Sequence, residues 1–508
     1  MSVTFDGIAS NINMVRILGA NLDHEPYKPF FIYKSAKIYT IFDACHLLKL
    51  IRNAFADFKT FYRNDDIISY YYITSLNELQ EKIQLNLANK LTYRHVNYFK
   101  NKMKVKLAAQ LLSNSVATSI EYCEKNTNIP EFKGANATVN FIRIVNNTFD
   151  IFNSRNLLSP GFKKPINSNN VNMIFKELDR FTEFMQSLTL ENYQKVITSN
   201  RKLGFLGFIF NIQSLKMLYN DYINSDLFKF LPLYKLSQDH LETFFSCIRS
   251  RGGFDNNPSA RSFISAYKRL LCHAEIQISD NTNCLPIQNV TILALSNLST
   301  MQRLNLAIGK TEDHVDEEIA EFSVSSIHEE DDFLVSLPYT QGKEVIKIVV
   351  QYISGYIVKA LQKKLKCADC IAVLHSQESD IKSLIFHKDK GGLIYPSKDV
   401  IDVCLFCETI YRENIRFKNL NKNQLRLIIT RTIYNFLNKF STLNDHCFPS
   451  LNDHIYDQDP INNHKYLLVK LIIEKFFIIR IKYEHKLRNV NKDSIRQFYN
   501  KMIIFKGT

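Results

Sequence analysis

The sequence predicts a mixed α/β protein in which α-helices predominate, and three observations support that fold class. Two β-rich runs near the start, "VTF" and "IYTIF", each end in an aspartate. Apolar residues recur at helical spacing over most of residues 66–235 and again over 341–508. Apolar residues form 45% of the 508, so the chain can bury sizeable cores, in about two to four domains.

The first strand, residues 3–5, delivers Asp6 into the turn "DGIASN". A strand this short is stable only beside other strands, so we expect it to pair with a later one. Residues 38–42 repeat the pattern, because the run "IYTIF" leads to Asp43 and then to a helix with apolar residues on one face.

Helices are predicted for the region that follows. The segment "TVNFIRIVNNTFDIFNSR", residues 138–155, has the apolar spacing of a buried helix. It carries Asp150 and Asn153, which are three positions apart and therefore lie on the same side of that helix.

The segment "LSQDHLETFFSCIRSRGGFDNNPSARSFISAYKRLL", residues 236–271, predicts two helices around a glycine-marked turn. Ser237 is suited to cap the first helix, which we expect to run to about Ile248. Asn257 and Pro258 are suited to start the second helix.

Asp239 and Glu242 fall in the first turns of the first helix and share one face. Acids are common there because the helix dipole favours them. Here, however, Arg249 and Arg251 follow, and acids that hold Mg²⁺ beside cations that hold phosphates suit metal-assisted phosphodiester chemistry. An Asp at a strand end and a Glu on a distant helix are ligands of a two-metal nuclease, which points to Asp6 and Glu242.

The formal net charge of +14 favours a polyanionic partner such as nucleic acid. A compositional bias toward Lys and Asn would explain the same charge without any partner. A helical scaffold protein with no nucleic-acid role is a further class of function that the composition allows. Residues 311–336 contain many acids and no Lys or Arg, so we expect an acidic linker over 274–340.

Two Cys-x-x-Cys pairs, Cys367 with Cys370 and Cys404 with Cys407, raise the question of zinc. The likelier ligand set combines Cys367 and Cys370 with two downstream histidines, His446 and His454. Buried structural cysteines are the alternative, and they suit Cys404 and Cys407 because these share one side of a predicted helix. A thioredoxin-like role lacks its βαβ context.

The chain has no secretory signal at its start and no uninterrupted apolar run of about 18 residues. Ten cysteines are too few for a disulfide scaffold. We therefore expect an intracellular protein with reduced cysteines and no membrane partner.

The 236–271 segment resembles the C-terminal RNase H-like segment of P-element-type transposases, the family that includes the THAP-domain transposases. Four further groups of residues are similar to that family and occur in its order: "FDGIASNINMVRILG", "IFDACHLLKLIRNAF", "LTYRHVNYFKNKMKVKLAAQLLSNSVA" with "FIRIVNNTFDIFNSR", and "GYIVKALQKKLKCADC" with "KGGLIYPSKDVIDVC". In the second, Ala44 and Cys45 replace two prolines of the family's motif.

The resemblance implies a partial RNase H-like fold interrupted by a helical GTP-binding insertion domain, followed by a helical C-terminal region. The implied boundaries are 1–60 for the first RNase H-like segment, 61–230 for the insertion domain, 231–273 for the C-terminal RNase H-like segment, 274–340 for the linker and 341–508 for the C-terminal region.

Carried over by position, Asp6 resembles the second catalytic carboxylate and Glu242 the third, both binding Mg²⁺. The resemblance also implies contacts to guanine nucleotide or its Mg²⁺, from Lys90, Val105, Asp150, Asn153 and Asp239.

The resemblance further implies a nuclear protein that acts in DNA transposition, with GTP as cofactor and transposon ends as partner; a homo-oligomer is left open. The family's N-terminal C2CH zinc finger and first catalytic Asp have no counterpart in this sequence. We therefore expect incomplete catalysis by this chain. The alternative is a domesticated, non-catalytic DNA- or nucleotide-binding protein of the same ancestry.

Overall fold

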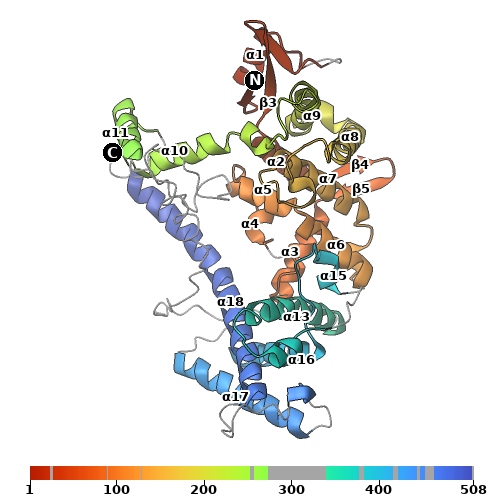
Figure 1. Cartoon of the computed structure of the whole chain (residues 1–508), viewed down its shortest axis with the longest axis vertical. Coiled ribbons are helices and arrows are strands. Elements are labelled where there is room, and N and C mark those ends of the chain that lie inside the picture. Colours follow the sequence, from red (N-terminus) through yellow and green to blue (C-terminus); the bar gives the residue numbers. More distant parts are fainter. Residues whose placement is uncertain are drawn as a thin grey trace. The chain divides into compact units, whose positions relative to one another are not determined.

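The structure is a computed structural model. It describes residues 1–22, 27–88, 90–127, 129–251, 257–272, 339–376, 383–415, 422–442, 447–451 and 463–505. The described residues form two compact units (Figure 1). The first comprises those within 1–80, 88–124 and 129–321, and the second those within 81–87, 125–128 and 322–508. The predicted acidic linker lies outside the described residues except for 339 and 340, which begin a helix.

A three-stranded sheet opens the first unit. Its elements are β1 (Ser2–Phe5), helix α1 (Ala9–Ile17), β2 (Phe30–Tyr33) and β3 (Ala36–Phe42). The strand order is β1-β3-β2, with β1 parallel and β2 antiparallel to β3. Both predicted strands are therefore confirmed, and the short first strand has the partner that it needs.

Two helices, α2 (Ala44–Phe58) and α9 (Leu203–Tyr222), pack together, and α9 also packs on β3. The fully buried Asn211 of α9 donates to the carbonyl of Phe42 and accepts from its N–H, both at 2.8 Å. A side chain at position 207 would place its Cβ 2.3 Å from Leu47 Cδ2, so Gly207 permits the close approach of α9 to α2.

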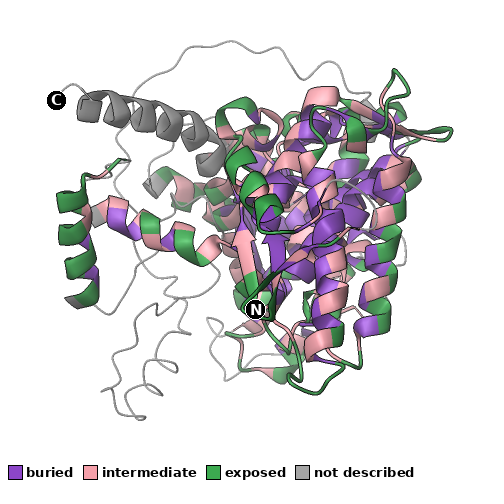
Figure 2. Ribbon diagram, turned by 90° about the horizontal axis from the view of Figure 1, so that it is seen from above, coloured by how far each residue is buried: buried purple, intermediate pink, exposed green. Residues whose placement is uncertain are grey.

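Helices make up most of the rest of the first unit, which confirms that they predominate. The elements are β4 (Thr60–Arg63), β5 (Asp66–Ser69), α3 (Tyr71–Ile83), α4 (Tyr93–Val96), α5 (Val105–Leu111), α6 (Asn114–Asn126), α7 (Asn136–Phe152) and α8 (Val171–Ser187). Phe55, Phe61 and Phe141 form an aromatic cluster with ring centroids 4.9–5.8 Å apart. Figure 2 shows buried residues gathered where helices pack together.

The segment that carries Asp239 and Glu242 forms a helical hairpin of α10 (Asp239–Arg251) and α11 (Ala260–Cys272). The two helices share a small core of their own. Helix α10 extends past the predicted end at Ile248. The predicted cap at Asn257 is wrong, because Ser259 performs this role: its Oγ accepts from the backbone N–H of Ser262 at 3.2 Å.

The second unit is helical. It contains α13 (Tyr339–Leu361), α14 (Ala368–Ala372), α15 (Leu384–Lys388), α16 (Lys398–Ile410), a π-helical turn (Tyr411–Ile415), α17 (Lys422–Thr442) and α18 (His464–Phe505). Cys404 and Cys407 of α16 are fully buried in its core. These two cysteines are therefore packing residues of α16, as the alternative to zinc expected.

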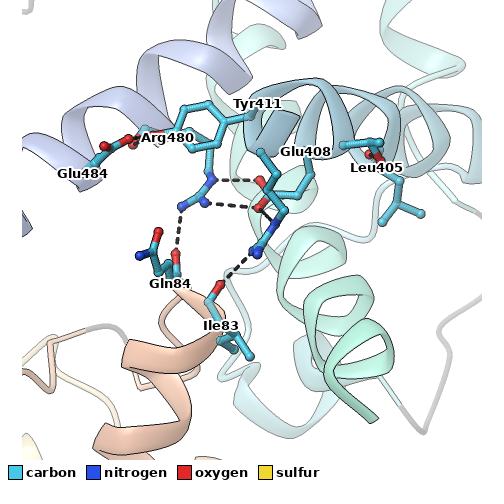
Figure 3. A network of polar contacts seen from close by, with 9 residues as sticks. Ile83, Gln84, Leu405, Glu408, Tyr411, Arg480 and Glu484 are labelled. Atoms are coloured by element: carbon cyan, nitrogen blue, oxygen red, sulfur yellow. Dashed lines mark hydrogen bonds and ion pairs between the residues drawn. The ribbon is translucent and has the colours of Figure 1, made fainter. Parts of the chain in front are cut away.

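A buried polar network holds segment 81–87 against α16 and α18 (Figure 3). Glu408 accepts from Arg480 at 2.7 and 3.1 Å and from Arg412 Nε at 2.7 Å. Each arginine also donates to a backbone carbonyl, Arg480 to Gln84 at 3.0 Å and Arg412 to Ile83 at 2.7 Å. One carboxylate thus orients two guanidinium groups toward the same turn of backbone.

Among the described residues, no helix combines the length and the apolar character that crossing a membrane requires.

Candidate functional site

Two aspartates leave the same edge of the sheet. Phe5 pairs with Phe42 in the parallel β1–β3 register, so the residues that follow, Asp6 and Asp43, are neighbours at the carboxyl ends of adjacent strands. Asp6 Oδ1 accepts from the side chain of Asn11 at 2.7 Å. Asp43 caps α2, since its Oδ2 accepts from the N–H of His46 at 3.0 Å.

The start of α10 is joined to this edge. Asp43 Oδ1 accepts from the backbone N–H of Gln238 at 3.2 Å. Asp239 and Glu242 occupy the first turn of α10, directly after that contact. This contact sets the start of α10 beside the end of β3 and brings Asp43 close to Asp239, whereas the close group of ligand atoms among the described residues includes neither Asp6 nor Glu242.

The charges of these groups act on one another. Burial, followed by the charge of Asp239, raises the pKa of Asp43 to about 6. Burial, followed by the charge of Lys49, lowers the pKa of His46, while Asp6 and Glu242 act in the opposite direction. Burial thus disfavours the charged imidazole, and the charges of Asp6 and Glu242, the two predicted catalytic carboxylates, both act on this ring.

Oxygen atoms at this site can accept a cation. A carboxylate oxygen of Asp43, one of Asp239 and the thiol of Cys45 lie within 4.8 Å of one another. Asp239 Oδ1 is buried without a hydrogen-bond partner among the described residues. An acceptor in that position is stabilised by a hard cation such as Mg²⁺, which prefers oxygen ligands to a thiol.

Three of the predicted nucleotide residues lie near the C-terminal end of α7. Arg155 donates to Asn153 Oδ1 and to Asp239 Oδ2, both at 3.2 Å. Asp150 accepts from Asn146 Nδ2 at 3.2 Å. Asp239 thus adjoins both the carboxylate site and the end of α7.

The other two residues predicted to contact nucleotide lie on other elements. Val105 is the buried first residue of α5, and Lys90 is exposed before α4.

The second unit holds a separate cluster of metal-ligand types. Cys367, Cys370 and His464 offer ligand atoms that all lie within 4.8 Å of one another. Cys370 Sγ is 3.4 Å from His464 Nδ1, although 94 positions separate the two residues. His446 and His454, which the sequence favoured, lie outside the described residues. His464 was not predicted.

Three family models match parts of the chain. They are the TNP-like GTP-binding insertion domain over residues 45–165, the TNP-like RNase H C-terminal domain over 234–268 and the C-terminal domain of DNA transposase THAP9 over 339–486. Human DNA transposase THAP9 is 31% identical to the chain over 496 residues, which cover 95% of the chain and 53% of the relative.

The chain is homologous to the P-element-type DNA transposases. The Transposable element P transposase of Drosophila melanogaster is 27% identical over 407 residues, 77% of this chain and 49% of that protein. A solved structure, the Drosophila P element transposase strand transfer complex, matches with a TM-score of 0.46 and 28% identity over 54% of this chain and 60% of that one. The chain spans about half the length of the curated relatives that it matches.

The family models and the two curated relatives confirm the resemblance to P-element-type transposases. The RNase H C-terminal model covers α10, including Asp239 and Glu242, and the insertion-domain model covers Asp150 and Asn153. Asp43 was predicted as a strand-end residue without a role. The signal that could have given it one is its similarity to Asp6, since both follow a β-rich run directly.

Proposed function

We propose that this chain contributes to Mg²⁺-dependent cleavage and joining of transposon DNA, with Asp6 and Glu242 as metal-binding carboxylates. The observation that carries the proposal is the convergence of the β1 and β3 ends with the first turn of α10. Homology to the P-element-type transposases supports the same assignment.

A divalent metal bound here would supply Lewis-acid activation of a phosphodiester and its attacking hydroxyl. Asp6 and Glu242 would bind the ion through carboxylate oxygens. The buried Asp43 would supply a further carboxylate beside them. His46, whose pKa burial lowers, would be the general base that accepts a proton from the attacking group.

Mn²⁺ titration of the full chain, followed by electron paramagnetic resonance, tests the metal site. Asp6→Asn and Glu242→Gln should each weaken binding by at least about tenfold, since even groups outside the ligand set cost 10–100-fold in metal affinity. Glu191→Gln, an exposed acid away from the site, is the matched control. Unchanged Mn²⁺ affinity in both site variants would refute the assignment.

We further propose that guanine nucleotide binds at the end of α7. Asp150 carries a carboxylate that can accept from the N1–H and amino groups of guanine, and it is partly exposed. Asn153, Arg155 and Asp239 lie in one hydrogen-bonded group beside α10. Lys90 and Val105 would complete the set that the resemblance implies.

Binding of a fluorescent GTP analogue to the full chain tests this site. Asp150→Ala should lower the affinity at least about tenfold, because loss of a charge-assisted pair of hydrogen bonds costs about 1.5–3 kcal/mol. Asp66→Ala, on an exposed hairpin position, should bind as the wild type does. Equal affinity of wild type and Asp150→Ala would contradict the proposal.

Nicking of supercoiled DNA distinguishes catalysis from binding alone. Mg²⁺-dependent nicking that Glu242→Gln abolishes is the expected result for a catalytic chain. DNA binding without nicking would instead favour the domesticated, non-catalytic protein. In both cases the net charge of +14 predicts an affinity for DNA that decreases as the salt concentration rises. A nuclear location would accord with a DNA partner.

A further inference from the structure

We propose that Cys367, Cys370 and His464 bind one Zn²⁺ ion in the second unit. The three residues come from two segments: the N-terminal end of α14 and the first residue of α18. Such a site is independent of the carboxylate site and of nucleotide binding, and neither the family models nor the relatives assign it.

The spacing of the ligand atoms fits zinc. With a Zn–S bond of about 2.3 Å and a Zn–N bond of about 2.0–2.1 Å, tetrahedral coordination places sulfur and nitrogen about 3.5 Å apart. The observed distance from Cys370 Sγ to His464 Nδ1 is 3.4 Å. The third atom, Cys367 Sγ, lies within 4.8 Å of both, so a modest change in its rotamer would complete three positions.

The ligand chemistry favours zinc over other cations. Two thiols and an imidazole form a soft donor set, which selects Zn²⁺ over Mg²⁺ or Ca²⁺. Cys367 is the N-cap of α14 without a side-chain capping bond, and Cys370 follows in the first turn.

Burial differs among the three residues of the site. Cys370 is buried, whereas Cys367 and His464 are intermediate, which leaves a path for the ion to enter. A fourth ligand, a side chain or water, would complete the tetrahedron. The bound ion would link α14 to the start of α18, across 94 positions of sequence.

Metal content of the purified full chain tests the proposal. We expect about one zinc per chain by mass spectrometry, and a Co²⁺-substituted protein with thiolate-to-metal charge-transfer absorption. The Cys370→Ser and His464→Ala variants should each lose zinc to a chelator at a rate at least about tenfold higher than the wild type. The His464→Cys variant should retain its zinc.

The second Cys-x-x-Cys pair gives the matched control. Cys404→Ala with Cys407→Ala removes two thiols from the same unit, and zinc should stay bound. Absence of zinc from the wild type, together with a Co²⁺ spectrum that lacks the charge-transfer band, would show only a thiol–imidazole hydrogen bond and overturn the proposal. Because the Co²⁺ titration uses the wild type, the outcome does not depend on whether the variants fold.

Discussion

Replacing Glu408 with Gln would leave the buried guanidinium group of Arg480 and the partly buried one of Arg412 facing a neutral side chain. Glu408 and Arg480 are each 2% exposed, and the carboxylate accepts three hydrogen bonds from Arg480 and Arg412. Removing one partner of a buried ion pair costs about 3–5 kcal/mol, because the remaining charge stays out of water. Gln keeps the volume and one acceptor, so we expect the lower end, about 3 kcal/mol.

Thermal unfolding followed by circular dichroism gives the measurement. For a unit of this size, each kcal/mol lowers the Tm by about 2–4 °C, so the variant should melt about 6–12 °C below the wild type. Hydrogen exchange should show faster opening of segment 81–87, α16 and α18. The control variant Glu344→Gln, on the exposed face of α13, should have the same Tm as the wild type. A Tm within 2 °C of wild type for Glu408→Gln would refute this reasoning.

Three further variants test the first unit by urea denaturation. The folded state holds the Asp43 proton more tightly than the unfolded chain, since the pKa rises from 3.8 to about 6, so this group lowers stability as the pH rises through that window. In EDTA, Asp43→Asn should therefore gain up to about 3 kcal/mol relative to wild type between pH 4 and pH 7, and an equal difference at both pH values would contradict this. Asn211→Ala leaves the buried N–H and C=O of Phe42 without their partner and should cost about 2–6 kcal/mol. Ser214→Ala, which removes one bond to Thr40, should cost only about 1 kcal/mol, and equal losses in the two variants would count against the account.

Local patterns were sufficient to predict the elements that place the carboxylates. The runs before Asp6 and Asp43 have β propensity and end in a residue that favours turns and helix caps, so both strands and the start of α2 followed from short-range chemistry. The boundaries of the α10–α11 hairpin were less certain. Asn257 and Ser259 are both good caps, and the choice between them depends on where the chain can turn into α11.

Long-range pairing could not be read from one sequence. Asp43 gained its place in the site only through the parallel register that sets Phe5 opposite Phe42. His464 reaches Cys370 because α14 packs on α18, and spacing along the chain favoured His446 and His454 instead. The contact of Arg480 with the carbonyl of Gln84 could not be predicted either, because the two residues are 396 positions apart in the sequence.

The most direct test of the central claim is to locate the divalent-metal site on the full chain. Fe²⁺ in place of Mg²⁺, with ascorbate and peroxide, cuts the backbone near the bound ion, and mass spectrometry maps the cuts. We expect cuts near Asp6, near Asp43 and in the first turn of α10, all suppressed by excess Mg²⁺ and by Glu242→Gln. Cuts confined to other segments, such as the acidic stretch at 311–336, would contradict the claim.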